Sequence, residues 1–113
     1  MGRARGLVVN AGNANVFTGK AGDAAVRRTA KSAAKILAAP ANEIFIASTG
    51  VIGEALNDAH ITQALPALYD KIGTKSWPDG ARAIMTTDTF AKGAARRVTI
   101  DGESVTIAGI AKG

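Results

Sequence analysis

The stretch Glu43-Ile44-Phe45-Ile46-Ala47-Ser48-Thr49-Gly50-Val51-Ile52-Gly53 decides how this 113-residue chain can fold. Its apolar run, Ile44–Ala47, predicts a short buried strand that breaks at Thr49-Gly50. A strand that ends in this way presents a hydroxyl and a backbone that other groups can approach closely. Such donors are the parts from which an oxyanion site is built. We therefore expect a strand that carries half of a catalytic site at its tip.

Helices and strands alternate on both sides of this strand. Asp101-Gly102 is typical of a tight hairpin turn, and the alternating residues around it predict two short strands. The pattern predicts one mixed α/β domain over residues 1–113. In chain order we expect a strand at 6–9, an Asn/Gly-rich loop at 10–15, a helix over 22–39, the strand at 44–47, a helix over 59–72, a short helix over 76–85 and a hairpin of 97–100 with 104–107.

The first predicted helix opens near Asp23, a candidate N-cap or first-turn acid, and Pro40 ends it. Its apolar residues recur at helical spacing and predict a buried face: Val26, Ala30, Ala33 and Leu37. In the second helix, Pro66 should kink or restart the chain. The loop at 10–15 favours turn formation, with orientation of a polar ligand by its asparagines as the alternative.

Composition excludes several classes of function. The absence of cysteine excludes disulfides, thiolate catalysis and cysteine-bound zinc. The net charge of +5 raises the question of nucleic acid, but the basic residues are scattered and no aromatic residues lie among them, so we expect a solvated basic surface. No apolar run is long enough to cross a membrane, so a cytoplasmic protein is expected.

The remaining candidates for chemistry are weak one by one. His60 lies beside Asp58, yet no serine or cysteine nucleophile is tied to it, and no spacing predicts a metal site. The glycines form neither a Walker pattern nor a dinucleotide-binding motif. The turn Thr86-Thr87-Asp88-Thr89 has two interpretations, helix capping or donors to a substrate carboxylate or amide.

Four segments together resemble the ornithine acetyltransferase family, also called glutamate N-acetyltransferases, over essentially the whole chain. They occur in the family's order: Asn10-Ala-Gly-Asn-Ala-Asn15 with Thr18-Gly19, Ser48-Thr-Gly-Val-Ile-Gly53, Ala83-Ile-Met-Thr-Thr-Asp-Thr-Phe90 and Ile110-Ala-Lys-Gly113. The resemblance implies a layered α/β sandwich of the N-terminal-nucleophile type. It also implies acetyl transfer from N-acetylornithine to glutamate in arginine biosynthesis, with acetyl-coenzyme A open as a second donor and no other cofactor.

In that family a precursor cleaves itself at an Ala-Thr bond, and the new N-terminal threonine is the nucleophile. By resemblance, Thr49 and Gly50 form the oxyanion hole, and Thr89, with Thr87 as its rival, contacts substrate together with Lys112. The cleavage segment is not in this chain. We therefore expect part of the family's first chain, inactive alone, whose partner is the second chain in a homo-oligomer or heterotetramer. The alternative is a non-catalytic α/β module that self-associates.

Overall fold

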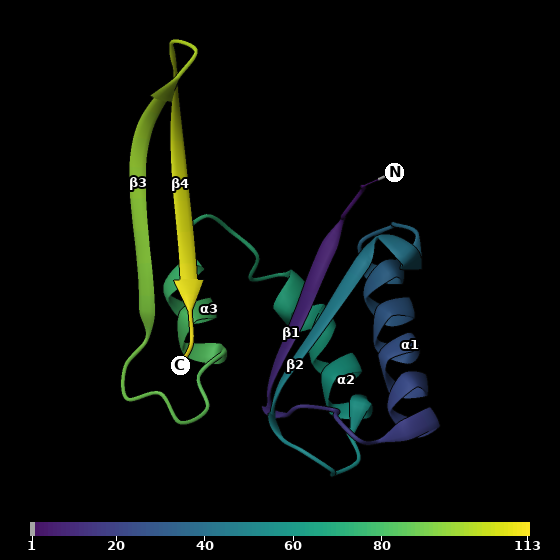
Figure 1. Cartoon of the computed structure of the whole chain (residues 1–113). Helices are drawn as coiled ribbons and strands as arrows, with labels where there is room; N and C mark the ends of the chain where they lie inside the picture. The colour runs from purple at the N-terminus through teal and green to yellow at the C-terminus, as the bar shows by residue number, and fades with distance from the viewer. Residues whose placement is uncertain (1) are drawn as a thin grey trace. The chain divides into compact units, whose positions relative to one another are not determined.

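The computed structural model describes residues 2–113, which form two compact units, the first ending at Ile72 and the second spanning Gly73–Gly113 (Figure 1). The first unit contains β1 (Gly6–Asn13), α1 (Gly19–Ile36), a 3₁₀ turn (Ala41–Glu43), β2 (Ile44–Val51) and α2 (Asp58–Tyr69). The second contains α3 (Trp77–Ala83), β3 (Lys92–Ile100) and β4 (Glu103–Ala111). The single domain expected over residues 1–113 stays a prediction.

In the first unit, β1 and β2 form a parallel pair. Parallel strands need a crossover between them, and α1 supplies it. The register runs from Gly6 opposite Ile44 to Asn13 opposite Val51, and each strand ends four residues later than the sequence pattern predicted. Because the strands are parallel, the Asn-rich segment and the Thr49-Gly50 tip end at the same edge.

Both helices of this unit cover one face of the two strands (Figure 1). The core is small, consisting of Ala33 and Ala34 from α1, Ile44 from β2 and Leu65 from α2. Alanines let the helix lie close to the strands, but they bury little apolar area. The other face of the strands stays exposed, with Leu7 at 63% and Phe45 at 57% exposure.

The buried face of α1 differs from the predicted one. It is formed by Gly22, Ala25, Thr29, Ala33 and Ala34, while Val26 and Ala30 lie beside it. A hydroxyl can occupy the centre of this face because Thr29 Oγ1 donates to the Ala25 carbonyl at 2.9 Å. The expected cap was also wrong: Thr18 precedes the helix, and Asp23 lies within it and pairs with Arg27.

Both helix ends in this unit lie earlier than expected. α1 ends at Ile36, before Pro40, because Ala38 adopts a left-handed φ of +48°. α2 does not restart at Pro66 but continues through it to Tyr69. The Asp70 N–H donates to the Pro66 carbonyl at 3.2 Å, so the residue that lacks a donor still serves as an acceptor.

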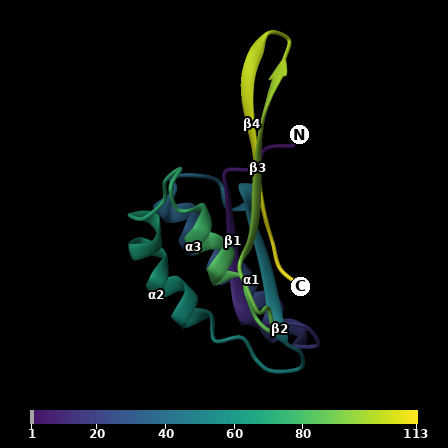
Figure 2. The same ribbon diagram turned by 90° about the vertical axis from the view of Figure 1, so that its left-hand side faces the viewer.

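The second unit is a hairpin packed on a short helix. Its strands are antiparallel, and Asp101 and Gly102 both have positive φ, as a type I′ turn requires. The predicted turn is confirmed, although both strands are longer than expected. The turn lies at the end of the hairpin away from α3 (Figure 2). Across residues 2–113, no helix has the length and apolar character needed to span a membrane.

Candidate functional site

The tip of β2 is held by polar contacts to the neighbouring strand. Ser48 Oγ donates to Asn10 Oδ1 at 2.6 Å, and Asn10 Nδ2 donates to the Asn13 carbonyl at 2.9 Å. Thr49 follows at a half-buried position, and Gly50 is exposed. The two residues predicted to form an oxyanion hole therefore lie on a fixed piece of backbone that a ligand can reach.

Gly50 occupies a position that only glycine fits. Its φ is +130°, a conformation that L-residues rarely adopt. A Cβ built there would lie 2.3 Å from the Gly12 carbonyl carbon and 2.7 Å from the Asn13 nitrogen. Both are backbone atoms, so neither can rotate away. The glycine therefore allows the close approach of β1 and β2 at the edge where Thr49 lies.

The Asn-rich loop wraps around this tip. The Ala14 N–H donates to the Val51 carbonyl at 2.8 Å, and the Gly53 N–H donates to the Val16 carbonyl at 2.9 Å. Asn13 Nδ2 donates to the Glu54 carbonyl at 3.1 Å. These bonds tie the segment that follows Thr49 and Gly50 to residues 13–16.

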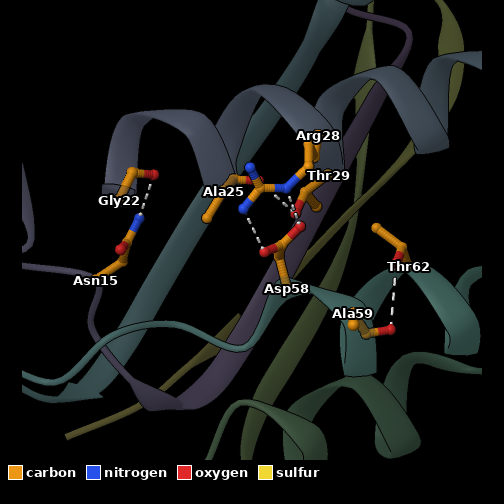
Figure 3. Close-up of polar contacts among 8 residues, drawn as sticks. All are labelled: Asn15, Gly22, Ala25, Arg28, Thr29, Asp58, Ala59 and Thr62. Atoms are coloured by element: carbon orange, nitrogen blue, oxygen red, sulfur yellow. Dashed lines mark hydrogen bonds and ion pairs between the residues drawn. The ribbon is translucent and has the colours of Figure 1, made fainter. Parts of the chain in front are cut away.

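Asn15 connects the same loop to the start of α1. Its Nδ2 donates to the Gly22 carbonyl at 3.1 Å (Figure 3), and its Oδ1 accepts a bond from Thr18 Oγ1 at 2.8 Å. Asn15 has a φ of +51°, a conformation that asparagine tolerates better than most residues. The loop predicted at 10–15 was therefore wrong for residues 10–13, which continue β1, and Asn15 makes its turn contacts after the strand ends.

A second polar cluster lies in the second unit and centres on Asp88, which the sequence reasoning did not single out. Asp88 Oδ1 accepts bonds from Lys92 Nζ at 2.9 Å and from the Gly113 N–H at 2.6 Å, and Oδ2 accepts one from the Thr86 N–H at 3.1 Å. These donors, Lys92 foremost, hold the pKa of the Asp88 carboxyl well below its ordinary value. The carboxylate is therefore ionised at neutral pH.

This cluster brings Lys112 to the hydroxyl-rich turn. Lys112 Nζ donates to Thr86 Oγ1 at 2.8 Å, across 26 residues of sequence. Thr87 and Thr89 are exposed on the same turn. Their roles in binding substrate stay predictions, as do those of Thr49, Gly50 and Lys112. The only sequence signal for Asp88 was its place between threonines, where an aspartate commonly accepts bonds from nearby main chain.

His60 is not connected to a nucleophile. It is exposed, and its Nε2 lies 3.3 Å from Asn57 Nδ2. Its neighbour Asp58 instead forms a two-bond ion pair with Arg28, at 2.8 Å for each bond (Figure 3). The Arg28 guanidinium lowers the pKa of Asp58, and the pKa of Arg28 is raised in turn. Within residues 2–113, no group of three or more His, Cys, Asp or Glu side chains could hold a metal ion.

Comparison with known proteins decides the family. A model described as the ArgJ family matches residues 1–113. The chain belongs to the ArgJ family. It is 56% identical over 110 residues to the arginine biosynthesis bifunctional protein ArgJ of Gluconobacter oxydans, and 52% identical over 109 residues to that of Caulobacter vibrioides. These matches cover 97% and 96% of this chain but only 26% and 27% of those proteins.

Solved structures agree with this assignment. The ArgJ protein of Bacillus halodurans superposes with a TM-score of 0.84 at 32% identity, covering 95% of this chain and 56% of that one. The ornithine acetyltransferase of Mycobacterium tuberculosis, solved with ornithine, gives 0.79 at 30% identity over 95% and 57%. The predicted family and the predicted layered α/β fold are confirmed.

Proposed function

We propose that the chain is part of the first chain of an enzyme that transfers an acetyl group from N-acetylornithine to glutamate. The observation that carries this proposal is the close approach at Gly50, in a chain of the ArgJ family. An exposed backbone held in place next to a hydroxyl is what an oxyanion site requires. The reaction would serve arginine biosynthesis, in keeping with the names of the relatives.

In this proposal the nucleophile is the N-terminal threonine of a second chain. Its hydroxyl oxygen attacks the acetyl carbonyl carbon, and ornithine leaves with its amine protonated. The glutamate amine then attacks the acetyl-threonine ester and releases the threonine hydroxyl. In each step the carbonyl oxygen carries negative charge in a tetrahedral intermediate, which Thr49 and the backbone at Gly50 would stabilise. Removing one such donor typically costs about 2.7–4 kcal/mol of the barrier.

The second cluster would bind substrate. Both amino-acid substrates carry a carboxylate, and the Lys112 ammonium is the complementary charge. The exposed hydroxyl of Thr89, or of Thr87 as its rival, would add a hydrogen bond. Binding of this kind fixes the acetyl carbon relative to the nucleophile.

Several further features belong to the same proposal. The chain alone is inactive, because the threonine nucleophile lies on the second chain. The complete enzyme is a homo-oligomer or a heterotetramer of both chains and acts in the cytoplasm. Acetyl-coenzyme A is a possible second donor. Neither nucleic acid nor a membrane is a partner.

A hybrid enzyme tests the proposal. In it, residues 2–113 of this chain replace the matching segment of the Gluconobacter oxydans ArgJ protein, which keeps the rest of that protein intact. Transfer of labelled acetyl from N-acetylornithine to glutamate is measured beside the parent protein. We expect activity in the hybrid and its loss in the hybrid with Thr49→Val. A folded hybrid without transfer, beside an active parent, would contradict the proposal.

The alternative, a non-catalytic module that self-associates, draws on one observation. The strand face opposite the helices exposes large apolar side chains, among them Leu7, Val9 and Phe45. Such a face favours association with another surface. Light scattering of the isolated chain, together with an acetyl-transfer assay after mixing with a threonine-initiated second chain, distinguishes the cases. A single defined oligomer that gives no acetyl transfer in the mixture supports the module. Restored transfer on mixing with a threonine-initiated second chain supports the enzyme.

A further inference from the structure

We propose that Asp88 is a positioning residue, which holds the Lys112 ammonium beside the Thr86–Thr89 turn and leaves its charge available to the substrate carboxylate. This inference rests on the proposed function, because it takes Lys112 as the group that binds substrate. Neither the family resemblance nor the motif spacing assigns a role to Asp88. The contacts of its carboxylate do.

The Asp88 carboxylate fixes the main chain on both sides of the Lys112–Thr86 contact. The Gly113 N–H, which donates to Oδ1, belongs to the peptide bond directly after Lys112. The Thr86 N–H, which donates to Oδ2, belongs to the residue whose hydroxyl accepts from Lys112. One side chain thus anchors the backbone of the cation and the backbone of its acceptor.

The distribution of charge supports the same role. Lys92 donates to Asp88 at 2.9 Å and lies 4.4 Å from the centroid of the Phe90 ring. The Asp88 side chain is 1% exposed, and Lys92, whose side chain is 29% exposed, supplies the matching charge. Lys112 meets only a neutral hydroxyl, and no carboxylate within residues 2–113 forms an ion pair with it. The ammonium therefore keeps an unmatched charge for an incoming anion.

Asp88 could instead serve stability alone, and the two roles predict different kinetics. A group that acts through Lys112 should lose its influence on substrate binding once Lys112 is removed. A group that only stabilises the fold should act equally with and without Lys112. Double-mutant cycles separate these cases, because residues that act together give non-additive effects.

The test uses the hybrid enzyme with Asp88→Asn, Lys112→Ala and the double variant. Asp88→Asn should raise KM for N-acetylornithine about tenfold and change kcat by less than about threefold, since it weakens binding of ground state and transition state alike. In the Lys112→Ala background the same substitution should change KM by less than about twofold. Asp79→Asn is the matched control: it removes an exposed aspartate of the same unit, paired with Arg82, and should leave KM unchanged.

The outcomes separate the positioning role of Asp88 from the binding role of Lys112. An Asp88→Asn effect that is undiminished without Lys112 overturns the positioning role and leaves the proposed function standing. An unchanged KM in Lys112→Ala overturns the binding role of Lys112 and this inference with it. Should Asp88→Asn not fold, Lys92→Met provides the second test. It frees the Asp88 charge to attract Lys112, so KM should rise, and an unchanged KM again refutes the inference.

Discussion

Replacing Gly50 with alanine should loosen the edge where β1 and β2 meet. A φ of +130° costs a residue with a Cβ on the order of 1–3 kcal/mol. The new methyl would also lie 2.3 Å from the Gly12 carbonyl carbon and 2.6 Å from its oxygen. Overfilling a packed site adds about 1–3 kcal/mol, since the strands must separate to accommodate it. We expect Gly50→Ala to destabilise this edge by roughly 3 kcal/mol.

Hydrogen exchange followed by mass spectrometry measures this effect locally. The relevant amides include that of Ala14, which donates to the Val51 carbonyl across the loop. A local loss of 3 kcal/mol corresponds to exchange about a hundredfold faster in peptides that cover the two strand ends. The hybrid enzyme should also lose acetyl transfer, because the backbone at Gly50 moves.

Gly53→Ala is the matched control. Gly53 also has a positive φ, +85°, but a Cβ built there meets no atom within 4 Å. Gly53→Ala therefore adds backbone strain of about 1 kcal/mol without the collision. Hydrogen exchange should accelerate less than tenfold. Equal acceleration by the two substitutions would show that the contact with Gly12 does not constrain this edge, and the argument for a fixed oxyanion site would fail.

Substitutions at three other positions test other parts of the structure. In the hybrid enzyme, Thr49→Val should lower kcat about 10²–10³-fold with little change in KM, while Thr49→Ser retains most activity; equal losses would exclude the hydroxyl as the contributing group. The pKa of Asp88 lies below its ordinary 3.8, so the stabilising effect of the carboxylate is full above that pH and is lost as the pH falls further. The melting temperatures of the hybrid and of its Asp88→Asn variant should therefore converge below about pH 4. A difference in melting temperature that does not depend on pH would contradict the ion pair with Lys92. Thr29 is fully buried, so Thr29→Leu should lower the free energy of unfolding, measured by chemical denaturation, by about 1–3 kcal/mol. Thr29→Val should lower it by less than about 1 kcal/mol. A larger loss for Thr29→Val than for Thr29→Leu would refute this argument.

Local chemistry explains which elements could be predicted from the sequence. The turn at Asp101 and Gly102 needs positive φ at both residues, and this dipeptide supplies it without help from the rest of the chain. The strand at Ile44 was recognisable from its apolar run. In α1 the predicted buried face shares only Ala33 with the observed one, and it did not include Thr29. The bond from Thr29 to the Ala25 carbonyl satisfies the hydroxyl and lets it pack as a small core residue.

The site depended on contacts that no local pattern contains. Asp88 meets the Gly113 N–H across 25 residues, and the hairpin between them sets that distance. The close approach of Gly50 to Gly12 likewise follows from the parallel register, which a hydrophobic pattern does not specify for two strands so short. The family resemblance predicted site roles for Thr49, Gly50, Thr89 and Lys112 because it carries such long-range information indirectly, and those roles stay predictions. It assigned no role to Asp88, whose contacts are visible only in the structure.

The two candidate clusters are fixed by different physical means, and this difference decides how each responds to mutation. At the Gly50 tip, main-chain bonds and one close approach hold the backbone, so a change of conformation should damage it more than a change of charge. At Asp88, one nearly buried carboxylate gathers an ammonium and two N–H groups, so loss of its charge should damage it most. The core cluster includes Ile44, the first residue of β2, but no residue of the tip, so apolar burial contributes little there. Rigidity at the tip must therefore come mainly from its backbone bonds, which is why a single methyl group at Gly50 is the most severe test of it.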